Sequence, residues 1–181
     1  MDLPQRIFLD TSVINFIVDH SESIFDGGEI SESVNDRAYD DIRAMMRIFY
    51  YADHNAIEMI ISKTTFQEIN ATTDQEKKEK LKKYCDELWM YFHYLIEDDY
   101  TAPGLEVKYY EEYLLDKGLG QLSDANDRQL IIEALFYKCD IFCTRDWKTI
   151  LKHRQLLKQK IPLEILTPLE WCLRYEYKKA Y

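Results

Sequence analysis

The sequence predicts an α/β fold in which helices surround a mainly parallel central sheet. Four short apolar runs of strand length alternate with longer segments in which apolar residues recur at helical spacing. Strands that alternate with helices are joined by right-handed crossovers, which make neighbouring strands parallel. With 181 residues, 46% of them apolar, the chain can bury one core but is too short for two. We therefore expect a single domain over residues 1–181.

The first strand is predicted at Arg6–Leu9, and the hydroxyls of Thr11 and Ser12 can cap a helix that begins near Val13. Residues 19–37 are polar, glycine-containing and acidic, so we expect an exposed insertion there. The next predicted elements are a helix over 40–53, a strand over 57–61, a short helix over 63–70 and a long helix over 74–97.

The second half of the chain continues the alternation. Pro168 is suited to the first turn of a terminal helix, because it lacks the amide hydrogen that a helix interior needs. The predicted elements are helices over 105–117 and 127–138, a strand over 141–143, a basic helix that ends near 160, and a strand over 163–166.

Four acidic residues fall at or just after the ends of apolar runs. They are Asp10, Glu68, Asp127 and Asp146. Open parallel sheets gather their ligand-binding residues at the carboxyl ends of the strands. Clustered carboxylates repel one another unless a cation neutralises them, and Mg²⁺ and Mn²⁺ prefer oxygen ligands. The sequence therefore predicts an acidic metal pocket suited to phosphodiester chemistry.

Each acid also has a simpler interpretation. Asp10 and Asp127 could cap a helix or favour its dipole. Asp146 could be a solvated loop acid, and Glu68, nearly two turns into a helix, could face solvent. Their occurrence together and in this order favours a shared site, although the residues alone do not place Glu68 in it.

Five segments of the chain occur in the order found in PIN-domain proteins. They are residues 8–13 (FLDTSV), 61–68 (ISKTTFQE), 126–135 (NDRQLIIEAL), 143–146 (CTRD) and 165–168 (ILTP). The chain thus resembles the PIN-domain family over nearly its whole length. The resemblance implies a Rossmann-type three-layer α/β/α fold and Mg²⁺- or Mn²⁺-dependent endoribonuclease activity. It places the metal-binding and catalytic acids at Asp10, Glu68, Asp127 and Asp146.

Many small bacterial and archaeal proteins that this chain resembles are VapC-like toxins of type II toxin-antitoxin pairs, which implies an antitoxin protein as a partner. The chain departs from the compact toxins by being longer, mostly through residues 19–37 and 74–97, and more acidic. Two other functions stay open: a catalytically silent PIN-like module that binds proteins, and a DNA-directed nuclease with the same acids.

Further residues are candidates for supporting roles. Thr11 and Thr144 could orient the carboxylates, and Asp124 could act as a helix cap or as an outer acid that adjusts the metal through water. Lys152 and Arg154 follow Asp146 closely in sequence and are the predicted RNA contacts.

Composition sets limits on the partners. With 23 basic against 33 acidic residues, the net charge of −10 disfavours broad nucleic-acid binding and is the main argument against a nuclease. No window approaches the roughly 18 apolar residues of a membrane span, and no signal peptide is visible, so we expect a cytoplasmic protein. The four cysteines are expected to be reduced and structural. The aromatic residues of the 74–97 helix could form core or a homodimer face.

Overall fold

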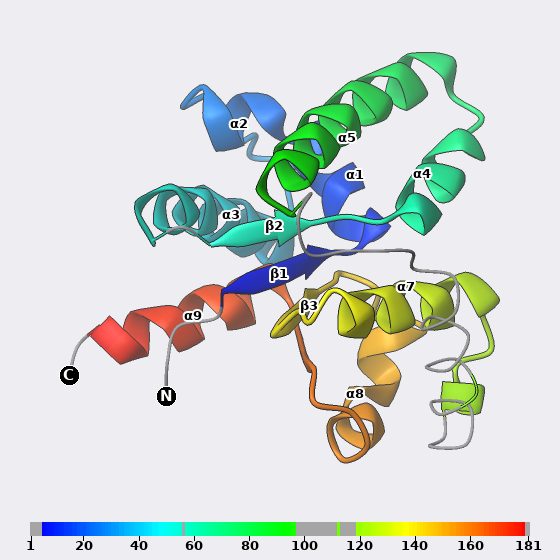
Figure 1. Ribbon diagram of the computed structural model, residues 1–181. Coiled ribbons are helices and arrows are strands. Elements are labelled where there is room, and N and C mark those ends of the chain that lie inside the picture. Colours follow the sequence, from blue (N-terminus) through cyan, green and yellow to red (C-terminus); the bar gives the residue numbers. More distant parts are fainter. Residues whose placement is uncertain (1–4, 56, 97–111, 113–118, 180–181) are drawn as a thin grey trace.

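A parallel β-sheet forms the centre of the molecule. The computed structural model describes residues 5–55, 57–96, 112 and 119–179. Within these ranges the sheet has four strands in the order β2-β1-β3-β4, all parallel (Figure 1). The strands are β1 (Arg6–Leu9), β2 (Glu58–Ile60), β3 (Ile141–Cys143) and β4 (Glu164–Leu166). The α/β class and the parallel sheet predicted from the sequence are confirmed.

Eight α-helices are described around the sheet, with a short 3-10 helix, η1 (Leu119–Gln121). The helices are α1 (Thr11–Asp19), α2 (Ser21–Phe25), α3 (Asp36–Asn55), α4 (Lys63–Asn70), α5 (Gln75–Ile96), α7 (Ala125–Phe136), α8 (Ile150–Lys158) and α9 (Pro168–Lys179). Helix α4 begins as predicted because the Ser62 side chain accepts the Thr65 amide hydrogen. The helix predicted over 105–117 lies outside the described residues, apart from Glu112, which is helical.

The side chains of each strand alternate between two cores. Ile7 and Leu9 of β1 pack in one core with residues of α1, α2, α3, α5 and α9. Phe8, between them, packs in the other core with α7 and α8 and stacks on Phe142 at 5.3 Å between ring centroids. Both faces of the sheet are therefore covered by helices, an arrangement that fits three α/β/α layers (Figure 1).

Strands β1 and β3 meet where the direction of winding reverses. From β1 the chain passes through α1, α2 and α3 on one face to reach β2, whereas β3 and β4 are joined through α8 on the other face. In open α/β sheets such a reversal leaves a crevice at the carboxyl ends of the two strands, where ligands bind. Asp10 and Thr144 are the first residues after β1 and β3, so both lie at this crevice.

Residues 19–37, predicted to be an exposed insertion, are only partly so. Most of residues 26–33 are exposed, but α2 places Ile24 in the core with 6% of its surface exposed. Helix α3 starts earlier than predicted because the Asn35 side chain accepts the amide hydrogen of Ala38 at 3.0 Å.

None of the four cysteines forms a disulfide, and all four are buried, as predicted. In the part of the chain that the structure describes, no helix combines the length and the apolar character needed to cross a membrane.

An ion pair between a buried acid and a partly exposed arginine joins the loop after β3 to three helices. The Arg145 Nε donates to Asp41 of α3 at 2.8 Å, and the Asp41 side chain is only 3% exposed. The other Asp41 oxygen accepts the Leu169 amide hydrogen of α9 at 3.3 Å. The Arg145 guanidinium also lies 3.6 Å from the ring centroid of Phe16 in α1. Asp41 was not singled out in the sequence, because an acid inside an amphipathic helix has the pattern of a surface residue.

We expect Arg145→Met to destabilise the protein strongly, because it leaves the buried Asp41 carboxylate without its cation. Removal of one partner of a fully buried pair costs roughly 3 to 5 kcal/mol, and the loss here should lie towards or below the lower end because the Arg145 side chain is 22% exposed. The matched control is Arg174→Met, which breaks the Arg174–Glu164 pair, whose side chains are 39% and 35% exposed. Pairs exposed to this extent contribute about 0 to 1 kcal/mol. Equal losses for the two variants in urea unfolding would contradict the expectation.

Candidate active site

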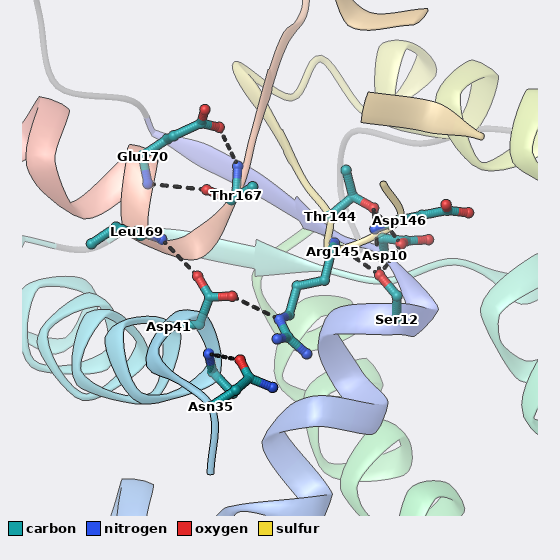
Figure 2. Close-up of polar contacts among 11 residues, drawn as sticks. Asp10, Ser12, Asn35, Asp41, Thr144, Arg145, Asp146, Thr167, Leu169 and Glu170 are labelled. Carbon is teal, nitrogen blue, oxygen red and sulfur yellow. Dashed lines mark hydrogen bonds and ion pairs between the residues drawn. The ribbon is translucent and has the colours of Figure 1, made fainter. Parts of the chain in front are cut away.

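The carboxyl ends of β1 and β3 bring residues from distant parts of the chain together. Figure 2 shows Asp10 and Ser12 beside Thr144 and Asp146, while the Arg145 side chain points away from them towards Asp41. The backbone amide of Asp10 donates to the Cys143 carbonyl at 3.0 Å, so the pairing of the two strands continues into the site. Residues that are 132 to 136 positions apart in sequence thus share one crevice.

Asp10 occupies the N-cap position of α1, but its side chain makes no capping hydrogen bond. Its Oδ2 atom instead accepts hydrogen bonds from Ser12 and, at 2.7 Å, from Thr144. Burial raises the pKa of Asp10 to about 6; the two hydroxyls oppose this shift, and the charges of Glu68 and Asp146 add to it. Asp10 is therefore the N-cap of α1 by position only, because its carboxylate accepts from Ser12 and Thr144 and not from the backbone amides of the helix.

Ser12 is a site residue that the sequence suggested only as a helix cap. Its hydroxyl donates to Asp10 and accepts the backbone amide of Arg145 at 3.0 Å, so it joins the two loops that form the crevice. The only signal in the sequence was its position two residues after Asp10.

Glu68 reaches the site from α4. The hydroxyl of Thr11 donates to Glu68 Oε2, which connects the first residue of α1 to the last turn of α4, 57 residues later in the sequence. Burial raises the pKa of Glu68, the Thr11 hydroxyl opposes the shift, and the charge of Asp127 adds to it. Glu68 is therefore half-buried beside another acid rather than exposed on a free helix surface.

Asp124 and Asp127 have different environments. Asp124 is the N-cap of α7 and accepts the Asn126 amide hydrogen at 2.7 Å. Asp127 lies in the first turn, and its Oδ2 atom is buried without a hydrogen-bond partner among the described residues. Burial raises the pKa of Asp127 to about 6; the nearby Thr149 hydroxyl opposes the shift, and the charges of Asp124, Asp10 and Asp146 add to it.

Asp146 differs from the other acids because donors surround it. Burial alone would raise its pKa, but hydrogen bonds from the hydroxyl and amide of Thr149 and from the Lys148 amide lower it below the usual value. The amide bonds measure 2.9 and 2.8 Å. The site therefore combines one acid whose pKa is lowered with three, Asp10, Glu68 and Asp127, whose pKa values are raised.

The four acids act electrostatically on one another, yet they do not form a ready-made metal centre. Among the described residues, no three Asp, Glu, His or Cys side chains are arranged so that they could hold a metal ion. Hydroxyl groups instead donate hydrogen bonds to carboxylate oxygens of Asp10, Glu68 and Asp146. The unpartnered Oδ2 of Asp127 and the all-oxygen character of the set do fit a hard cation, once the side chains turn from their hydroxyl partners.

The two predicted RNA contacts lie on α8. Lys152 is exposed, whereas Arg154 uses one nitrogen to contact both Glu170 oxygens at 2.6 and 2.7 Å. The charge of Arg154 is thus neutralised within the protein. The aromatic side chains of α5 that could form a homodimer face, residues 89–94, lie outside the described side chains.

Comparisons of the chain with protein-family models, with curated proteins and with solved structures found no match.

We expect Asp10→Asn to stabilise the metal-free protein at neutral pH. The pKa of Asp10 is 3.8 in the unfolded chain and about 6 in the folded protein. The group therefore costs the folded state no stability below pH 3.8 and its full amount above about pH 6. Stability from this group is thus lost as the pH rises through that window. Near pH 7.5 in EDTA the gain should be on the order of 2 kcal/mol, or roughly 5 °C in Tm.

The gain from Asp10→Asn should shrink towards zero at pH 4, where the folded wild type already carries the proton. The control is Asp40→Asn, which removes one charge from an exposed position of α3. A similar gain for both variants would attribute the effect to net charge and not to the cluster.

Proposed function

We propose that this chain is a PIN-like endoribonuclease that depends on Mg²⁺ or Mn²⁺ and hydrolyses RNA phosphodiester bonds. The observation that carries the proposal is the convergence of Asp10, Glu68, Asp127 and Asp146, from four separate segments, on the crevice beside β1 and β3. The resemblance of the sequence to PIN-domain proteins supports the same four residues.

The energetic cost of the cluster favours an enzyme over a silent binding module. Asp10 and Asp127 titrate near pH 6 because burial and neighbouring charges penalise their ionised forms. A fold that needed only a protein-binding surface would gain stability by replacing these acids with neutral residues. Their presence is explained if a cation neutralises them in the working protein.

The residues have distinct roles in this proposal. Asp10, Asp127 and Asp146, with Glu68, would hold the cation, which when bound would lower the pKa of an attacking water and stabilise charge on the phosphodiester. In this structure the hydroxyls of Ser12, Thr144, Thr11 and Thr149 hold the carboxylates through hydrogen bonds, part of which the side chains would give up to bind the cation. Asp124 positions Asp127 by capping α7.

Because the net charge is −10, RNA binding must depend on a few positively charged side chains near the site. Exposed Lys152 remains a candidate for such a contact. The family resemblance also supports a toxin role with an antitoxin as the partner. A DNA-directed nuclease would use the same acids, so the assay below includes DNA.

Purified protein should cleave RNA in Mn²⁺ or Mg²⁺ and be inhibited by EDTA. Asp10→Asn and Asp146→Asn should each lose roughly 100-fold or more of this activity, because each removes a charge that holds the cation. Independently of activity, millimolar Mn²⁺ should raise the Tm of the wild type but not of Asp10→Asn. The proposal fails if Mn²⁺ leaves both Tm and RNA unchanged, and faster cleavage of single-stranded DNA would reassign the substrate.

Asp127 should matter more than Asp124, although the two are three residues apart. Asp127→Asn should reduce metal-dependent cleavage by on the order of 10³-fold, since its Oδ2 is buried without a partner. Asp124→Asn, the matched variant on the same helix, should reduce cleavage by roughly 10 to 100-fold through the weakened position of Asp127. Circular dichroism should show both variants folded. The reverse order of effects would make Asp124 the principal acid.

A further inference from the structure

Two exposed side chains beside the acid cluster have no role in the site described so far. Trp147 directly follows Asp146, and 42% of its surface is exposed. Arg37, in the first turn of α3, places its guanidinium 4.3 Å from the centroid of the Trp147 ring. A cation–π contact of this kind at a protein surface contributes only about 0.5 to 1 kcal/mol to stability. Stability alone therefore gives a weak reason for this pair.

Arg37 differs from the other arginines near the site. Arg145 is paired with the buried Asp41, and Arg154 with Glu170. Arg37 has no carboxylate partner within the described residues, and its side chain is exposed. On a chain with a net charge of −10, an unpaired guanidinium beside the acids is one of the few groups able to meet a phosphate.

The pair lies on the α3 side of the cluster. Arg145 leaves the loop after β3 towards Asp41 of α3, away from Asp10 and Asp146 (Figure 2). Trp147, two residues further on, meets Arg37 one helical turn before Asp41. Because consecutive Cα atoms are about 3.8 Å apart, the backbone of Trp147 adjoins that of Asp146. If an RNA strand is bound with its scissile phosphate at the acids, the indole of Trp147 is therefore within reach of a neighbouring nucleotide.

We propose that Trp147 and Arg37 form a clamp for one unpaired nucleotide of a single-stranded RNA substrate, next to the cleaved bond. The indole stacks on the base, and the guanidinium contacts the adjoining phosphate. The clamp rests on the proposed nuclease function and specifies its substrate as single-stranded, because a base inside a duplex cannot reach an indole. It also explains how an acidic chain can bind RNA through local contacts.

The test measures binding of a fluorescein-labelled, non-pairing 12-nucleotide RNA by anisotropy in EDTA, where cleavage is prevented. Trp147→Ala should weaken binding roughly 10 to 100-fold, and Trp147→Phe, which keeps a ring, much less. Arg37→Gln should weaken binding and flatten the plot of log affinity against log salt by about 0.7, the loss of one phosphate contact on a single strand. The same RNA annealed to its complement should bind more weakly and be insensitive to Trp147→Ala.

The matched controls are Tyr39→Ala and Arg43→Gln. Tyr39 is 41% exposed on the same helix, and the Arg43 guanidinium lies 5.8 Å from its ring centroid, so the two form a comparable surface pair. Both controls should bind RNA as the wild type does. Circular dichroism of every variant establishes that the fold is kept.

The outcomes separate the clamp from the nuclease. If the wild type cleaves RNA in Mn²⁺ and Trp147→Ala binds RNA as tightly as the wild type, the clamp is overturned and the nuclease stands. Loss of binding in Trp147→Ala without cleavage by the wild type in any metal supports the clamp and overturns the nuclease. A wild type that binds no RNA overturns both. Tighter binding of single-stranded DNA, with the same loss in Trp147→Ala, keeps the clamp but overturns RNA as its substrate.

Discussion

The parallel pairing of β1 with β3 determines where every residue of the candidate site lies. Leu9 is opposite Cys143 in the register, so the next residues of both strands, Asp10 and Thr144, emerge side by side. The two strands are more than 130 residues apart in sequence, and helices on opposite faces carry the chain away from them. A shift of one residue in this register would turn the Asp10 side chain towards the other face of the sheet.

The electrostatics of the site follow from how unevenly hydrogen-bond donors are distributed among the acids. Asp146 is surrounded by donors from the Lys148 and Thr149 turn, which favour its charged form. Asp10 and Asp127 have fewer donors than their burial requires, so their pKa values rise to about 6. The negative charge of the ionised acids is thus not compensated within the crevice, and a divalent cation is the simplest species that would compensate it.

The sequence predicted what local patterns encode. Strand β3 matched its prediction over 141–143. Helix α4 matched over 63–70, and Ser62 marks its start. Contacts between distant segments had no local signal: Glu68 lies at the site because α4 packs against α1, where the Thr11 hydroxyl donates to it. Asp41 is the clearest case, because the residue that explains its burial lies 104 positions later. Long-range geometry, rather than propensity, decided these roles.

The Arg145–Asp41 pair also constrains how the molecule can fold. Asp41 belongs to α3, yet its cation follows β3, so an N-terminal fragment that packed α3 in its native place would bury an uncompensated carboxylate. Partial structures of the first half are thereby penalised, and contacts of high sequence separation must form before the core can close. A molecule built in this way is expected to be highly cooperative, with the crevice and the core completed in a single transition.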